Sequence, residues 1–193
     1  MIHLTILALY TTIIISLVWA RFNVFYTPKH LTTISVLYDS IVSVQILVTY
    51  YSLVMGALDP IIPIAFCIGL YTCSLYLFWW SVFTARNLDF AFSNEVSRII
   101  RTGPYYFIRH PFYLSYTLSW ISSSLLFNSI GLWITLGLLV IFYFLSARKE
   151  EKVFNDSMYS IQYAEYIRST GMFLPRVTQW KNWLLKLLPT KYQ

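Results

Sequence analysis

Residues 111–147 read PFYLSYTLSWISSSLLFNSIGLWITLGLLVIFYFLSA, and this stretch decides the fold because two apolar runs flank one turn signal. The runs are Pro111–Phe127 and Leu132–Ala147, and Asn128-Ser-Ile-Gly131 between them is typical of a tight turn. As helices the arms are each about 25 Å long, close to the thickness of the hydrocarbon layer. We expect two short spans forming a helical hairpin; a hairpin packed within a bundle without fully crossing it is the alternative.

Three longer apolar runs precede the hairpin, at Ile2–Ala20, Ile34–Met55 and Ile61–Phe83. The 193-residue chain is 58% hydrophobic and only 11% charged, whereas soluble domains are about one quarter charged. We therefore predict an all-α fold, a multi-pass membrane helical bundle with about five transmembrane helices. A cleaved signal peptide is the alternative for the first run, but no lysine or arginine precedes it and no small-x-small site precedes Arg21.

Polar residues within the runs have structural explanations. Asp39 lies within about two helical turns of the start of the second run, which favours an interfacial, solvated carboxylate over a functional acid inside the membrane. Cys67 and Cys73 are six residues apart, so on a helix they point to different faces and cannot form a disulfide with each other. No metal-ligand cluster and no repeat is visible.

We expect one integral membrane domain over residues 1–193, with three N-terminal spans in 1–85 and a core with the hairpin and C-terminal interfacial helices in 86–193. In the connector before the hairpin, Ser93 or Asn94 could cap a short helix running through Arg101. After the hairpin, a charged segment to Arg168 keeps apolar residues at helical spacing, which predicts an amphipathic helix continuous with the last span and ended by Thr170-Gly171. Residues Gln179–Leu188 suit a helix lying in the membrane interface.

The distribution of basic residues predicts the topology. With five spans, all 14 lysines and arginines fall on one side of the membrane, in the connectors after the first and third spans and in the C-terminal region. The positive-inside rule then places the N-terminus outside and the C-terminus in the cytoplasm. The net charge of +6 is explained by juxtamembrane residues that meet anionic membrane lipids, so we expect no nucleic-acid partner.

The same topology brings two polar segments together on the cytoplasmic face. One is Arg101–Pro111, reading RTGPYYFIRHP, and the other is Glu150-Glu151, which the hairpin returns to that face. Together they would offer cations, acids and aromatic platforms, a set that suits S-adenosylmethionine, which has a carboxylate, an ammonium, a sulfonium and an adenine. The candidates are Arg101, Arg109, His110, Tyr105, Tyr106, Tyr113, Glu150 and Glu151. Alternatively, Arg109-His110 simply face lipid headgroups and Glu150-Glu151 form a solvated helical turn.

A family resemblance favours the first interpretation. Gly103-Pro104-Tyr105, then Arg109-His110-Pro111-x-Tyr113, then Glu150-Glu151, then Tyr163-x-x-Tyr166 with Thr170, Phe173 and Pro175 resemble, in order and spacing, the isoprenylcysteine carboxyl methyltransferase family and its phospholipid-methyltransferase relatives. The resemblance covers roughly residues 98–176. The family's eukaryotic members carry additional N-terminal spans, so the resemblance leaves open whether the acceptor is a prenylcysteine.

The resemblance implies a membrane methyltransferase with a cytoplasmic C-terminal region that binds S-adenosylmethionine and releases S-adenosylhomocysteine. Its acceptor would be a lipophilic, prenylcysteine-like molecule entering from the bilayer. Carried over to this sequence, the cofactor-binding residues would be Gly103, Pro104, Tyr105, Tyr106, His110, Pro111, Tyr113, Leu114, Glu150 and Glu151. The catalytic candidates are Arg109, His110, Glu151 and Arg168, the two arginines as partners for a carboxylate.

Two acceptor chemistries and two other classes of protein stay open. A carboxylate is already ionised at neutral pH and needs no base, whereas the ammonium of phosphatidylethanolamine must first lose a proton to His110 or a glutamate. A small transporter should show paired broken helices in two halves, and none is visible. A membrane scaffold that recruits lipid through its basic C-terminal region needs no pocket.

Overall fold

The computed structural model describes residues 2–24, 33–86 and 99–176, and within these ranges the fold is all-helical. Its one β-type contact there is an isolated bridge between Ile108 and Gly171. The elements are α1 (Ile2–Asn23), α2 (Thr33–Val54), α3 (Ile64–Arg86), the 3-10 helix η1 (Gly103–Tyr106), α4 (Pro111–Phe127), α5 (Ile130–Asn155) and α6 (Ser160–Ser169).

The expected spans are confirmed as helices. Four helices of the described chain, α1, α2, α3 and α5, are long and apolar enough to cross a membrane. The remaining expected span is α4, which has 17 residues and is therefore about 25 Å long. It begins at Pro111, because a proline at the first helical position lacks only an N–H that would be unpaired there anyway.

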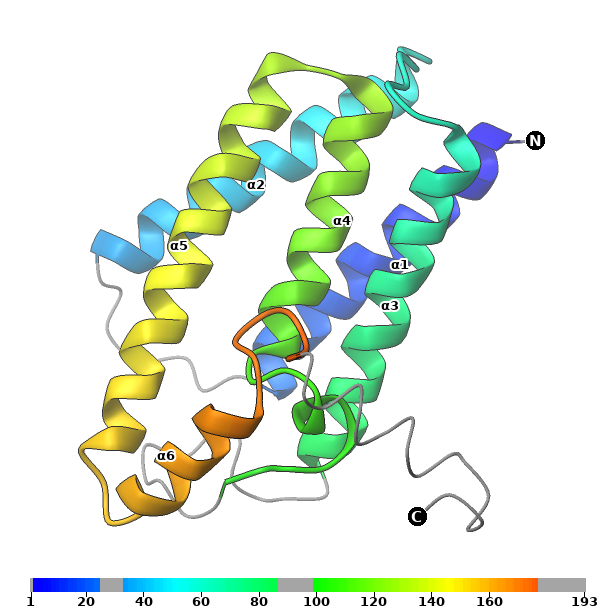
Figure 1. Ribbon diagram of the computed structural model, residues 1–193. Helices are drawn as coiled ribbons and strands as arrows, with labels where there is room; N and C mark the ends of the chain where they lie inside the picture. Colours follow the sequence, from blue (N-terminus) through cyan, green and yellow to red (C-terminus); the bar gives the residue numbers. More distant parts are fainter. Residues whose placement is uncertain (1, 25–32, 87–98, 177–193) are drawn as a thin grey trace, which may run out of the picture.

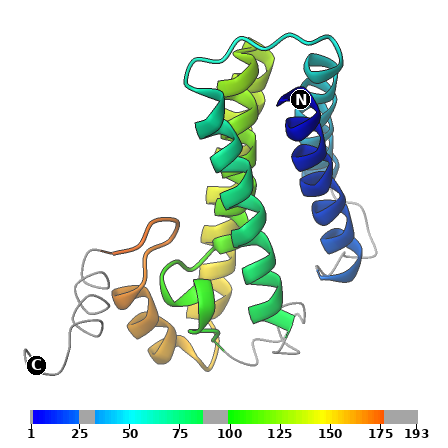
Figure 2. The same cartoon turned by 90° about the vertical axis from the view of Figure 1, so that its right-hand side faces the viewer.

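The helices form two layers. Helices α3, α4 and α5 run side by side with α4 in the middle (Figure 1), and α1 and α2 form a second layer behind them (Figure 2). Small residues of α4 allow its close approach to α3, since Ser122 Oγ donates to the carbonyl of Cys67 at 2.8 Å. Ser74 of α3 donates in return to the carbonyl of Ser115 at 2.7 Å. The centre of the bundle is thus closed by hydrogen-bonded serines and not by bulky apolar side chains alone.

The hairpin turn is shorter than expected. Asn128 adopts the left-handed conformation with φ of 45°, and α5 starts at Ile130, so the connection is two residues long. Asn128 also donates from Nδ2 to Asp59 in the α2–α3 connector at 3.3 Å. The turn is therefore fastened to the neighbouring connector at the same end of the bundle.

Two helix predictions need correction. Residues 99–102 are not helical, so the short helix expected through Arg101 is wrong at that end; its beginning at Ser93 or Asn94 lies outside the described residues. The amphipathic helix does continue the last span through the glutamates, but it ends at Asn155, and α6 follows after a turn. Stacking of Phe154 on Tyr163, with ring centroids 4.7 Å apart, holds this reversal closed. The expected interfacial helix at Gln179–Leu188 lies outside the described residues.

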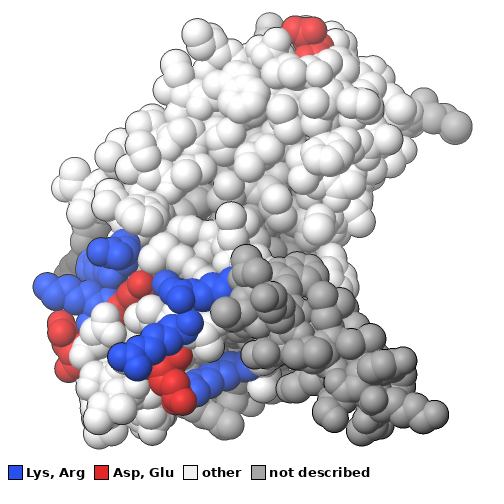
Figure 3. All heavy atoms as spheres, in the orientation of Figure 1, with Lys and Arg blue, Asp and Glu red and all other residues white. Residues whose placement is uncertain are grey.

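On the face that Figure 3 shows, charged side chains gather at one end, apart from one acidic residue at the opposite end. Arg21 of α1 and Asp39 of α2 form an ion pair at 2.7 Å, and their side chains are 41% and 38% exposed. The expected interfacial carboxylate is thus partly solvated and paired. Cys67 and Cys73 are both free thiols, as their spacing predicts.

Candidate active site

The polar segment before α4 begins with a turn that only glycine fits well. Gly103 has φ of +58°, and a Cβ there would lie 2.4 Å from Oγ1 of Thr84 on α3. Buried Pro104 follows as the second residue of η1. The Gly-Pro pair therefore lets this segment pack directly against the end of α3.

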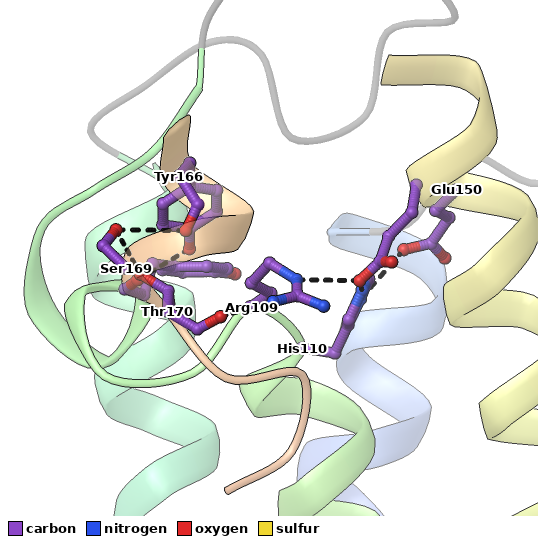
Figure 4. Close-up of polar contacts among 8 residues, drawn as sticks. Arg109, His110, Glu150, Tyr166, Ser169 and Thr170 are labelled. Carbon is purple, nitrogen blue, oxygen red and sulfur yellow. Dashed lines mark hydrogen bonds and ion pairs between the residues drawn. The ribbon is translucent and has the colours of Figure 1, made fainter. Parts of the chain in front are cut away.

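Arg109 forms a buried ion pair with Glu151 of α5. Its Nε donates to Oε1 of Glu151 at 2.8 Å, and the two side chains are only 7% and 8% exposed. Its Nη1 donates to the backbone carbonyl of Thr170, just beyond α6. Figure 4 shows Arg109 near Thr170, and with its bond to Glu151 this one side chain links the segment before α4, helix α5 and the residues after α6.

His110 lies between two carboxylates. Nε2 is 3.2 Å from Oε1 of Glu151, and Nδ1 is 3.4 Å from Oε2 of Glu150. Burial lowers the pKa of His110, but the hydrogen bonds to Glu150 and then Glu151 outweigh burial and raise that pKa above its ordinary value. Two acceptors facing the two ring nitrogens are best satisfied by an imidazolium, which donates from both. We call Arg109, His110, Glu150 and Glu151 the charge cluster.

Aromatic rings adjoin the charge cluster. Tyr113 stacks on His110 with centroids 5.7 Å apart and on Tyr143 of α5 with centroids 5.2 Å apart. The Tyr113 hydroxyl donates to Glu150, whose side chain is 52% exposed. The ring of Phe173 lies 5.9 Å from that of His110. The half-exposed carboxylate of Glu150 is therefore held by a tyrosine hydroxyl, and the His110 ring lies between the rings of Tyr113 and Phe173.

A backbone strap holds the cluster from the other side. We call residues 170–173 the strap. The backbone N–H of Arg109 donates to the Gly171 carbonyl at 2.9 Å, and that of His110 donates to the Met172 carbonyl at 3.1 Å. Gly171 has no room for a side chain, since a Cβ would lie 1.7 Å from the carbonyl oxygen of Leu174. Tyr166 of α6 adds a hydrogen bond from its hydroxyl to the carbonyl of Tyr105 at 2.6 Å.

The structure brings most of the predicted site residues together. Arg109, His110, Tyr113, Glu150 and Glu151 contact one another directly, and Pro111 and Leu114 lie in the adjoining first turn of α4. The burial of Arg109, His110 and Glu151 contradicts the alternative in which these side chains face headgroups or solvent. Glu150, half exposed, fits either interpretation.

Two predicted arginines take no part in the ion pairs of the charge cluster. Arg101 donates to the carbonyl of Gln162 at 2.5 Å and is 3.6 Å from Glu165, so it fastens α6 and does not reach the charge cluster. Arg168 is exposed in the last turn of α6. Conversely, sequence reasoning missed Tyr143 and the strap carbonyls, because a tyrosine inside an apolar run and a backbone oxygen carry no distinctive pattern.

Comparison with known proteins identifies the family of this chain. The sequence model of the family described as phospholipid methyltransferase matches residues 59–162, from the connector before α3 into α6. No curated protein gives a significant match. The matched part is more than half of the 193 residues and contains the polar segment, the hairpin and both glutamates of the charge cluster. The chain therefore belongs to the phospholipid methyltransferase family, and it is a membrane methyltransferase.

Proposed function

We propose that the charge cluster and its aromatic neighbours bind S-adenosylmethionine, and that the protein transfers a methyl group to the carboxylate of a lipophilic, prenylcysteine-like acceptor. The observation that carries this proposal is the pair of carboxylates, one buried and one half exposed, around the buried side chains of His110 and Arg109 beside stacked aromatic rings. Buried charges are costly unless they are paired, so such a cluster at the end of a membrane bundle is a strong candidate for a functional site.

The chemistry of these side chains fits the cofactor. S-adenosylmethionine supplies an activated methyl group on a positively charged sulfur. The half-exposed carboxylate of Glu150 can accept from an ammonium or lie against a sulfonium, and the partly exposed ring of Phe173 can lie against an adenine. The Gly103–Tyr106 turn, with Pro111 and Leu114, would complete the wall of the cofactor site.

The pairing of the candidate bases supports a carboxylate acceptor. His110 faces a carboxylate from each ring nitrogen, and Glu151 accepts from two cations, so neither is well placed to take a proton from an ammonium. An ionised carboxylate has no proton to lose. The work left to the protein is to align the acceptor oxygen and to exclude water as opposite charges meet.

Arg168 is our candidate for holding the acceptor carboxylate. The guanidinium of Arg109 is engaged by Glu151 and by the Thr170 carbonyl, whereas Arg168 is exposed at the end of α6. We place this end of the bundle in the cytoplasm and the N-terminus outside, because the positive-inside rule favours that orientation.

A second candidate function is methylation of the amine of phosphatidylethanolamine. Membership of the phospholipid methyltransferase family favours it. In that reaction Glu150 would be the proton acceptor, because it is the more exposed of the two glutamates in the cluster. A farnesylated cysteine and phosphatidylethanolamine, offered to the purified enzyme in parallel, would distinguish the two.

The proposal is tested by isothermal titration of S-adenosylhomocysteine into detergent-solubilised wild type, His110→Ala and His3→Ala. His3 is an exposed histidine of α1 and serves as the matched control. We expect binding to wild type and His3→Ala, and affinity at least about 10-fold weaker in His110→Ala, the loss typical of removing a charged hydrogen-bonding partner. Absence of binding to wild type would refute the proposal and favour a scaffold.

A further inference from the structure

Helix α6 is fastened to the polar segment before α4 by the side chain of Arg101. Its guanidinium donates to the carbonyl of Gln162 at 2.5 Å and lies 5.7 Å from the centre of the Tyr166 ring. Its contact with the carboxylate of Glu165 is longer, at 3.6 Å. Because Gln162 is three and four residues before the other two partners, all three share one face of α6. One arginine therefore holds that whole face.

A second contact joins the same face of α6 to the same polar segment. The hydroxyl of Tyr166 donates to the backbone carbonyl of Tyr105 at 2.6 Å, and Tyr166 is only 5% exposed. Tyr105 lies four residues after Arg101, within η1. Two contacts thus set where α6 lies against the polar segment, one at Arg101 and one at Tyr105.

Helix α6 leads directly into the strap. The backbone N–H of Thr170 donates to the carbonyl of Tyr166 at 2.9 Å, and the carbonyl of Thr170 accepts from Nη1 of Arg109. In Figure 4, Tyr166 and Thr170 lie on one side of Arg109 and Glu150 lies on the other. A shift of α6 would therefore move the carbonyl that orients the guanidinium of Arg109.

The orientation of Arg109 bears in turn on the rest of the charge cluster. A guanidinium is planar and rigid, so its bonds to Thr170 and to Glu151 cannot be adjusted independently of each other. Nε of Arg109 donates to Oε1 of Glu151 at 2.8 Å, and the same oxygen is 3.2 Å from Nε2 of His110. A continuous set of contacts thus runs from Arg101 through α6 and the strap to His110.

We infer that Arg101 is a positioning residue for the charge cluster: it acts on Arg109 through α6 and the strap, and it touches neither cofactor nor acceptor. The inference rests on the proposed function. The side chains of Arg101 and Glu165 are 42% and 77% exposed, so their ion pair adds little to stability. A displacement of about 1 Å at a site can nevertheless reduce its function by about 100-fold. The contribution of Arg101 is therefore to the geometry of the site more than to the stability of the fold.

The test compares Arg101→Ala, Arg101→Lys and Glu165→Gln with Arg148→Ala. Lysine can still donate to the Gln162 carbonyl, whereas Glu165→Gln removes only the longer, exposed contact. Arg148 is an exposed arginine of α5 and serves as the matched control. The first measurement is hydrogen–deuterium exchange, without ligand, at the backbone N–H groups of Arg109 and His110, because these groups donate to the strap carbonyls. Titration with S-adenosylhomocysteine and thermal unfolding complete the set.

We expect Arg101→Ala to exchange these two amides about 10-fold faster than wild type and to bind S-adenosylhomocysteine about 10-fold more weakly. Its Tm should fall by less than about 4 °C. Arg101→Lys should stay within about threefold of wild type in both measurements, and Glu165→Gln and Arg148→Ala within about twofold.

Unchanged exchange at Arg109 and His110 in Arg101→Ala would overturn the inference, even if binding were lost, because a residue that contacts the cofactor directly would lower affinity without loosening the strap. A larger fall in Tm would also overturn it, since Arg101 would then support the fold in general. Absence of S-adenosylhomocysteine binding to wild type would overturn the proposed function, and the exchange result would still decide whether Arg101 acts on Arg109.

Discussion

Glu151→Gln is expected to destabilise the protein by about 3–5 kcal/mol, the loss typical when one partner of a buried ion pair is removed. One oxygen of Glu151 serves two cations, Arg109 at 2.8 Å and His110 at 3.2 Å. The three side chains are 7–9% exposed, so water cannot replace the missing charge. Glutamine keeps the shape but leaves the guanidinium buried without its counter-ion.

The assay is thermal unfolding in detergent, followed by tryptophan fluorescence. At about 2–4 °C per kcal/mol for a chain of this size, the expected fall in Tm is about 6–20 °C. Asp39→Asn is the matched control, because it removes a carboxylate from an ion pair whose side chains are 41% and 38% exposed. Exposed pairs contribute about 0–1 kcal/mol, so that variant should lose less than about 4 °C. A Glu151→Gln shift no larger than that of Asp39→Asn would refute the reasoning.

Three further predictions follow from the same geometry. Because the pKa of His110 is raised, the stabilising effect of the charged imidazole is complete below about pH 6.5 and is lost as the pH rises through the folded-state pKa. The difference in Tm between wild type and His110→Gln should therefore shrink from acid to alkaline pH. A difference that widens would contradict the raised pKa. Gly171→Ala should abolish S-adenosylhomocysteine binding in titration calorimetry, because the added Cβ would overlap the Leu174 carbonyl. Gly137→Ala, in open space on α5, should bind normally. Equal affinity in both variants would show that the strap is not needed for binding. Gly103→Ala should lower Tm both because φ is positive there and because the added Cβ would contact Thr84. Adding Thr84→Ala should restore part of the loss and leave about 1–2 kcal/mol of backbone strain. Strictly additive losses in the double variant would show that the two residues do not touch.

The spans were predictable because their signals are local. Pro111 marks the first residue of α4 and Asn128 its end, as the proline and the turn signal indicate. The meeting of Arg109 and His110 with Glu150 and Glu151 was also predictable, since two arms of similar length return the chain to the side it left. Sequence therefore predicts which charged residues meet, although they are some forty positions apart.

The strap and the contacts of Tyr143 with Tyr113 and Tyr38 were not predictable from local patterns. The carbonyls of Gly171 and Met172 belong to the backbone, so no residue type in the sequence predicts their hydrogen bonds. Tyr143 and Tyr38 sit in apolar runs where a tyrosine is unremarkable. Arg101 looked like a cation for the pocket, but its guanidinium is used by the Gln162 carbonyl and Glu165, contacts that depend on where α6 folds back.

Transfer of labelled methyl groups from S-adenosylmethionine to extractable lipid products, by purified wild type and Glu151→Gln, tests the central claim most directly. The acceptors are N-acetyl-S-farnesylcysteine and dioleoylphosphatidylethanolamine, supplied separately. The account predicts base-labile methyl ester formed on the farnesylated carboxylate by wild type, and a large loss of that product in Glu151→Gln under conditions where the variant is folded. Label appearing only on phosphatidylethanolamine would contradict the carboxylate assignment, and undiminished transfer by folded Glu151→Gln would contradict the placement of the active site.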